Sequence, residues 1–191
     1  MADQGLTERS AFSSWKPIKS PNISIDVREN QTLASIAAAR GKAANVAAIF
    51  AADYGVELPA TPACVSGRDV SVMWAGPDQW IVIADRKGGR DLELELKPKL
   101  AGIAGVVDQS DARAIVRISG PRARNILAKG LPIDLHPRVF KTHDVAITHA
   151  SHIGVIVWQV DDAPTFDIAM FRSFADSFTH WLRDASAEYL G

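Results

Sequence analysis

The sequence lacks a pair of cysteines, a long apolar run and an excess of charge of either sign. Cys64 is the only cysteine among 191 residues, so the chain cannot form an internal disulfide, which is typical of a reducing compartment. The 21 basic and 22 acidic residues nearly balance. Such a balance provides no electrostatic attraction to DNA, RNA or anionic lipid. We therefore expect a protein that binds neither nucleic acid nor membrane.

The apolar stretches are short. The longest, such as Ile153–Trp158, fall far below the roughly 20 residues that a membrane-spanning helix needs. Residues 1–20 are mostly polar and contain no apolar core of the kind that a signal peptide requires. Together with the single cysteine, these absences predict a cytoplasmic protein.

Motifs for phosphate or metal binding are also missing. No group of glycines has the spacing of a dinucleotide-binding loop or a P-loop. Gly120 does lie at a predicted strand–helix junction, but Pro121 follows it and has no backbone N–H to offer a phosphate. His149 and His152 lack the helical spacing and the partner cysteines of common zinc sites. We predict no cofactor-binding residue and no metal ligand on this chain.

Catalytic residues are equally hard to find. Ser110 has Asp108 and Asp111 nearby but no histidine and no nucleophile elbow. These three side chains are better suited to capping and shaping a turn. Cys64 follows Pro59 and Pro62 and has no base beside it, which favours a small packed side chain over a nucleophile. We therefore predict that the chain carries no catalytic residue.

Hydrophobic periodicity predicts a mixed α+β fold. We expect strands at 22–28, 32–39, 70–74, 80–84, 105–108, 113–119, 145–149, 155–160 and 166–171, and helices at 42–54, 91–100, 121–129 and 174–189. We expect strand 32–39 to pair with strand 22–28, although its alanines also suit a short helix. Residues 75–79 are predicted to form the turn of a hairpin between strands 70–74 and 80–84, and residues 109–112 the turn between strands 105–108 and 113–119. Segment 91–100 also alternates as a strand would, so its assignment as a helix has an alternative.

The order of elements divides the chain into similar halves. Residues 1–20 are predicted to form an extended N-terminal arm, and residues 21–191 a single α+β domain. Its halves, at about 21–101 and 105–190, each read strand, strand, helix, strand, strand, helix, with an extra strand in the second. No linker separates them, so we expect two structural repeats around one sheet-rich core.

Three residues are candidates for contact with a partner. Trp15 is a bulky aromatic residue in a polar arm, where it can dock either on its own domain or on another chain. His136 and Arg138 flank Pro137 in a polar connection, and a rigid loop with these groups can bind a carboxylate or a partner. For these two, an ordinary loop with no binding role is the alternative.

Several segments, taken together and in order, resemble the γ subunit of heterotetrameric sarcosine oxidase. The similarity covers about residues 20–190, and no single motif in it is specific. The matching segments are WAGPDQW at 74–80, VDQSD at 107–111, ISGPRAR at 118–124, GLPIDLHP at 130–137 and RSF at 172–174. Residues 107–120 are also similar to the wider folate-binding aminomethyltransferase superfamily.

The resemblance implies a fold like the N-terminal part of an aminomethyltransferase. It also implies a complex in which an α subunit binds NAD and carries a folate domain, a β subunit holds FAD and FMN, and a δ subunit binds zinc. Such a complex demethylates sarcosine to glycine, passes the one-carbon unit to tetrahydrofolate and makes hydrogen peroxide. The family assigns no catalytic residue and no cofactor to γ, so none is expected here.

The superfamily resemblance leaves a second hypothesis, a stand-alone folate-binding or one-carbon transfer protein. Against it, the chain of 191 residues is short for a full transferase, because the transferase has a further C-terminal domain that completes its pocket. The first hypothesis, a noncatalytic subunit that contacts mainly the α chain, agrees better with the missing catalytic motifs.

Overall fold

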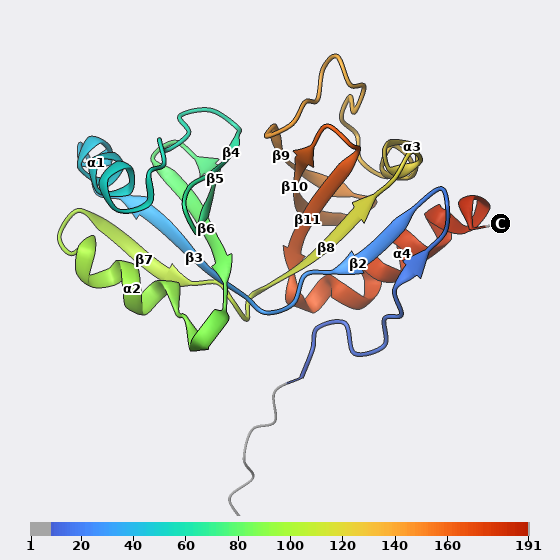
Figure 1. Cartoon of the computed structure of the whole chain (residues 1–191), viewed down its shortest axis with the longest axis horizontal. Coiled ribbons are helices and arrows are strands. Elements are labelled where there is room, and N and C mark those ends of the chain that lie inside the picture. The colour runs from blue at the N-terminus through green and yellow to red at the C-terminus, as the bar shows by residue number, and fades with distance from the viewer. Residues whose placement is uncertain (1–8, 191) are drawn as a thin grey trace, which may run out of the picture.

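The computed structural model of the protein describes residues 9–190, which form two antiparallel sheets (Figure 1). We call them the first and the second sheet. The first sheet has the strand order β4 (Cys64–Ser66), β5 (Ser71–Gly76), β6 (Gln79–Asp85), β3 (Gln31–Ala38) and β7 (Ala104–Asp108). The second has the order β1 (Ile18–Lys19), β2 (Ser24–Val27), β8 (Arg113–Ser119), β11 (Thr165–Phe171), β10 (Ile153–Asp161) and β9 (Val145–Ala150).

Helices cover the outer face of each sheet (Figure 1). The first lobe is the first sheet with α1 (Ala43–Tyr54) and α2 (Leu92–Lys99), and the second lobe is the second sheet with α3 (Ala123–Leu127) and α4 (Ala175–Ser186). Short 3-10 turns lie at Lys87–Gly89, Arg172–Phe174 and Ala187–Tyr189. The predicted α+β class and the four predicted helices are confirmed.

Local chemistry explains where two of these helices begin and end. Helix α1 ends at Gly55, whose φ of 65° is the left-handed conformation that glycine adopts without a steric penalty. Helix α2 begins after Asp91, whose carboxylate accepts a hydrogen bond of 3.1 Å from the backbone N–H of Leu94. These ends set the helices against the strands that follow them.

Buried side chains form three apolar clusters. One lies between the first sheet and its helices and includes Ile36, Val82 and Phe50. A second lies between the second sheet and its helices, with Val116 and Phe178 among its members. The third fills part of the space between the two sheets, and its members are Leu33, Cys64, Met73, Ile81, Ile83, Ile115, Val145, Ile156, Trp158 and Ala169. Both faces of each sheet are therefore apolar over part of their area.

The chain crosses between the lobes twice, and this differs from the predicted halves. Strand β2 belongs to the second sheet, where Ser24 pairs with Ser119, and β7 belongs to the first sheet, where Ala38 pairs with Ala104. The predicted pairing of 22–28 with 32–39 is therefore wrong, as is that of 105–108 with 113–119. The predicted halves meet at 101–105. The observed lobes differ from these halves, because β2 lies in the second sheet and β7 in the first.

The segment predicted as a turn, residues 109–112, is one of these crossings. The Ser110 hydroxyl accepts a hydrogen bond of 3.0 Å from the Leu33 backbone N–H, and donates to Asp108 Oδ1 at 2.6 Å. Ser110 and Asp108 therefore shape this connection, as predicted, although the connection joins two sheets. A short polar connector suits a hairpin turn and a crossing equally well, so its composition cannot separate the two.

The described part of the N-terminal arm, residues 9–20, packs on the second lobe. Phe12 and Trp15 are buried in its core, and Ile18–Lys19 adds to the edge of the sheet by pairing with β2. The arm was predicted to be extended, and residues 1–8 of that prediction lie outside the described residues. Within residues 9–190, no helix is both long and apolar enough to span a bilayer.

Candidate binding site

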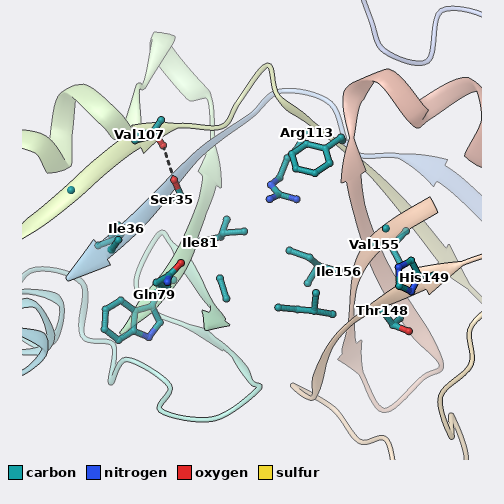
Figure 2. A pocket seen from close by; sticks show the side chains of 17 residues that line it. Ser35, Ile36, Gln79, Ile81, Val107, Arg113, Thr148, His149, Val155 and Ile156 are labelled. Carbon is teal, nitrogen blue, oxygen red and sulfur yellow. Dashed lines mark hydrogen bonds between the residues drawn. The ribbon is translucent and has the colours of Figure 1, made fainter. Parts of the chain in front are cut away.

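The space between the two sheets contains an open cleft of about 520 Å³ (Figure 2). Strands β3, β6 and β7 of the first sheet form one wall, and β9, β10 and the adjoining ends of β8 and β11 form the other. The third apolar cluster closes the neighbouring part of the same space. The cleft is thus an unfilled continuation of an internal core.

Small side chains explain why this part of the space stays open. On β3, Leu33 fills the closed part, whereas Ser35 and Ala37 occupy the equivalent inward positions along the cleft, since alternate residues of a strand share one face. Gly105 pairs with Ala37 on the first sheet. On the opposite wall, a Cβ at Gly154 would meet no atom within 4 Å. The two walls therefore face each other without enough side-chain volume to meet.

Large apolar side chains stand exposed around the cleft. Val107 is 57% exposed, Ile147 53% and Phe171 50%, and all three line it. Val107 comes from the first sheet, and the other two come from the second. Contiguous exposed apolar surface on a folded protein marks a place where something binds.

One cation, Arg113, projects into the space between the sheets (Figure 2). Its guanidinium carbon lies 4.8 Å from the centroid of the Phe171 ring, a favourable cation–π distance. Among residues 9–190, its buried Nε has no hydrogen-bond partner and no ion pair includes it. Burial lowers the pKa of Arg113 from its ordinary value, because a low dielectric disfavours the charged form.

Positive charge continues behind Arg113 in an adjoining pocket of about 280 Å³. Four further arginines line this pocket, Arg9, Arg28, Arg86 and Arg172, together with the acidic Glu29 and Asp111. The Nε of Arg28 is also buried, and no described residue forms a hydrogen bond with it. Guanidinium groups arranged in this way favour an oxyanion such as a carboxylate.

The three residues predicted to contact a partner lie outside the cleft. Trp15 is only 9% exposed and docks on its own domain, with the Arg183 guanidinium carbon 5.7 Å from its ring centroid. His136 and Arg138 are exposed in the connection between α3 and β9, where His136 Nδ1 accepts a hydrogen bond from the Arg138 N–H. The structure does not bring these three together, and their contact with a partner stays a prediction.

Sequence reasoning missed Arg113. Arg113 is the first residue of a predicted strand, and the pattern of residues around it does not differ from that around Arg117, four residues later. The structure separates the two, since Arg117 pairs with Asp167 whereas Arg113 faces the cleft. The sequence signal that could have indicated the cleft is the pair of small residues Ser35 and Ala37, two positions apart on one strand face. They leave a cavity only if another sheet lies opposite.

The side chains considered for catalysis are already engaged. Cys64 belongs to the cluster between the sheets, and burial raises the pKa of its thiol to about 12, so its reactive thiolate is scarce at neutral pH. The Ser110 hydroxyl donates to Asp108 and is held against β3. Within residues 9–190, no three His, Cys, Asp or Glu side chains gather as a metal site. The arrangement is suited to binding.

Comparison with known proteins identifies relatives of the whole domain. The family model described as "Sarcosine oxidase, gamma subunit family" matches residues 38–188. Sarcosine oxidase subunit gamma from an Arthrobacter species is 34% identical over 161 residues, 83% of this chain and 77% of that protein. The subunit of the same name from Corynebacterium sp. strain P-1 is 34% identical over 145 residues, 74% of this chain and 70% of that one.

Solved structures agree. A chain of the heterotetrameric sarcosine oxidase from Corynebacterium sp. U-96, in complex with pyrrole 2-carboxylate, matches with a TM-score of 0.83 and 27% identity over 96% of this chain and 97% of that one. Aminomethyltransferase T of the glycine cleavage system from Bartonella henselae matches with a TM-score of 0.66 and 12% identity, over 85% of this chain and 45% of that one. The second likeness shows the fold, and the predicted aminomethyltransferase-like fold is confirmed.

Proposed function

The chain belongs to the sarcosine oxidase gamma subunit family, and on this basis we propose that it is the noncatalytic γ subunit of a heterotetrameric sarcosine oxidase. The observation that carries the proposal is the match over 96% of this chain to a chain of such a complex, with a TM-score of 0.83. The engaged side chains of Cys64 and Ser110 support a role other than catalysis. An open apolar cleft is what a subunit that binds its neighbours requires.

In this proposal the partner subunits α, β and δ perform the chemistry. The complex oxidises the N-methyl group of sarcosine, releases glycine, transfers the one-carbon unit to tetrahydrofolate and reduces oxygen to hydrogen peroxide. NAD and tetrahydrofolate are bound by α, FAD and FMN by β, and zinc by δ. The γ chain supports the assembly of the complex, chiefly through α.

Co-expression with the three partner subunits tests the proposal. We expect all four chains to purify as one complex that produces hydrogen peroxide when sarcosine is added. The γ chain expressed alone should have no flavin absorbance and no sarcosine turnover. A bound flavin in the pure γ chain, or a fully assembled and active complex without γ, would contradict the proposal.

A second candidate function is folate binding by the isolated chain. The observation that favours it is the aminomethyltransferase fold together with a cleft of about 520 Å³, a volume within the usual range for small-molecule sites. The chain covers only 45% of the transferase it matches. Titration calorimetry of the isolated chain with tetrahydrofolate separates the two functions, since micromolar binding supports the second and no heat of binding excludes it.

A further inference from the structure

We propose that the cleft between the sheets receives a polypeptide segment of a partner subunit, which presents apolar side chains and one carboxylate that pairs with Arg113. The inference rests on the proposed function and specifies the surface through which the chain is held. Four properties of the cleft lead to it: its exposed apolar residues, its unpaired cation, its free strand edges and the charge around it.

The apolar residues indicate an occupant larger than a metabolite. Val107, Ile147 and Phe171 are each at least half exposed, and they come from both walls of the cleft. A small molecule between the walls would leave much of these three side chains in contact with water. A polypeptide segment that enters the cleft and continues across its mouth covers them, and such burial is the main favourable term in protein association.

The unpaired cation indicates the chemistry of that segment. Arg113 is partly buried, with its Nε shielded from solvent, and burial of a charge is costly unless a counter-charge and hydrogen bonds accompany it. Arg113 has the Phe171 ring but no carboxylate within ion-pair distance in the part of the chain that is described. An aspartate or glutamate side chain, or a C-terminal carboxylate, accepts two hydrogen bonds from a guanidinium. The occupant therefore carries an anion among apolar groups.

Two strand edges at the cleft offer backbone hydrogen bonds. Strand β7 pairs only with β3, and β9 is the outermost strand of the second sheet. The first residues of β9 contact the segment before β4, where the Val145 N–H donates to the Pro62 carbonyl, but Ile147 and His149 lie beyond that contact along the cleft. An extended segment can add to such an edge, because its own N–H and C=O groups complete the ladder.

Charge also argues against a second copy of this chain as the occupant. In a two-fold symmetric dimer the same surface meets itself. The cleft contains Arg113, and the adjoining pocket has four more arginines against two acidic residues. Like charges would then face each other across the interface, whereas an acidic partner segment would be attracted.

Site-specific cross-linking in the assembled complex tests the proposal. A photoreactive amino acid such as p-benzoylphenylalanine replaces Val107 in the cleft, and in a matched control it replaces Leu94, which is 73% exposed on α2 and does not line the cleft. We expect the Val107 probe to capture a peptide of a partner subunit that contains an Asp, a Glu or a C-terminus next to apolar residues. We expect the Leu94 probe to capture no partner peptide.

Binding measurements with variants provide the second readout. Val107→Asp combined with Ile147→Asp should weaken association of γ with the other subunits about tenfold or more, because the exposed apolar residues dominate burial. Leu94→Asp should leave association unchanged. Arg113→Gln should weaken association by a similar factor, and Arg113→Lys by less, since lysine keeps the charge but loses the bidentate geometry. Circular dichroism of each isolated variant checks that it folds.

The outcomes separate the two levels of the proposal. If wild-type γ joins the complex but the cleft variants join equally well, or if the Val107 probe captures only another γ chain or no protein, the cleft assignment is wrong and the proposed function stands. The cleft assignment would also be wrong if a small carboxylate alone bound in the cleft and shielded its residues. If wild-type γ does not associate with α, β or δ at all, the proposed function is wrong and the cleft assignment with it.

Discussion

The two parts of the space between the sheets share most of their strands and differ in how they are filled. In the closed part, large side chains such as Met73, Ile83 and Trp158 meet across the space. In the open part, Ser35, Ala37 and Gly154 leave a cleft. The same alternation of residues thus produces a core at one end of the strands and an open cleft at the other.

Charged residues differ between the two parts in the same way. At the closed end, Arg117 and Asp167 form two hydrogen bonds of 2.6 and 2.7 Å, within a small pocket that Cys64 and Trp158 also line. At the open end, Arg113 has an aromatic ring but no carboxylate partner within the described part of the chain. The guanidinium of Arg117 is paired within the chain, whereas that of Arg113 is a group that another molecule can satisfy. Stability should therefore depend on the closed part and association on the open part.

Thiol alkylation should show the largest contrast. Burial raises the pKa of Cys64 to about 12 from 9.0, which lowers its thiolate fraction near pH 8 about a thousandfold. A cysteine introduced as Ile147→Cys, in a Cys64→Ala background, lies in the open part and should react at an ordinary rate. Iodoacetamide labelling followed by mass spectrometry compares the two, and equal rates would show that the closed part is not closed.

Truncation of a large side chain should lower the free energy of unfolding much more in the closed part than in the open part, and this is the second-largest contrast. Trp158→Ala removes a buried indole from the closed part and should lower the free energy of unfolding by about 3–5 kcal/mol. Ile147→Ala removes exposed atoms from the open part and should change it by about 0.5 kcal/mol or less. Urea denaturation of the isolated chain measures both. A large loss with Ile147→Ala would mean that the cleft is closed in solution.

Removal of one charge should follow the same division. Asp167→Ala leaves Arg117 without its carboxylate, and we expect a loss of about 3 kcal/mol. Arg113→Gln removes a cation that pairs with no carboxylate of residues 9–190, so stability should change by less than about 1 kcal/mol. Thermal unfolding of the two variants beside the wild type provides the measurement. Equal losses would indicate that Arg113 has an internal partner.

Filling the cleft should have the smallest effect and the opposite sign. Gly154 lies in strand β10, and a Cβ there meets nothing within 4 Å. Gly154→Val should stabilise the isolated chain by roughly 0.5–1 kcal/mol, because glycine weakens a strand, while it narrows the cleft and weakens assembly. As a control, Gly120→Ala should destabilise, since φ is 115° there and a Cβ would lie 2.8 Å from the Asn22 carbonyl oxygen. Urea midpoints give both values, and a loss with Gly154→Val would contradict the open geometry.

Local structure was predictable from the sequence because it depends on neighbours in the chain. The stripe of Val46, Phe50 and Tyr54 predicts α1, and each of the three is buried. The turn residues 75–79 between strands 70–74 and 80–84 predict the β5–β6 hairpin, which forms with Trp74 opposite Trp80. Such elements follow from periodicity and turn residues alone.

The pairing of distant strands and the cleft could not be predicted in this way. The sheet to which β2 and β7 each belong depends on pairing with strands far away in the sequence. Ser24 of β2, for example, pairs with Ser119. Arg113 and Gly154 line the same cleft only because the first sheet lies opposite the second. A single sequence does not contain that placement, because short polar connectors permit more than one topology.

The two crossings of the chain have a consequence for its synthesis. While the ribosome makes the first lobe, β2 has emerged but its neighbour β8 has not, and the edge of β3 stays unpaired until Ala104–Asp108 follows. The first lobe is one continuous stretch, residues 31–108, whereas the second lobe needs β2 from before that stretch and β8 to β11 from after it. A nascent chain therefore exposes the edge of β2 while the whole first lobe is made, and if the chain is cut between the lobes at 109–112, the fragment with the first lobe would have to supply β2 to the other fragment.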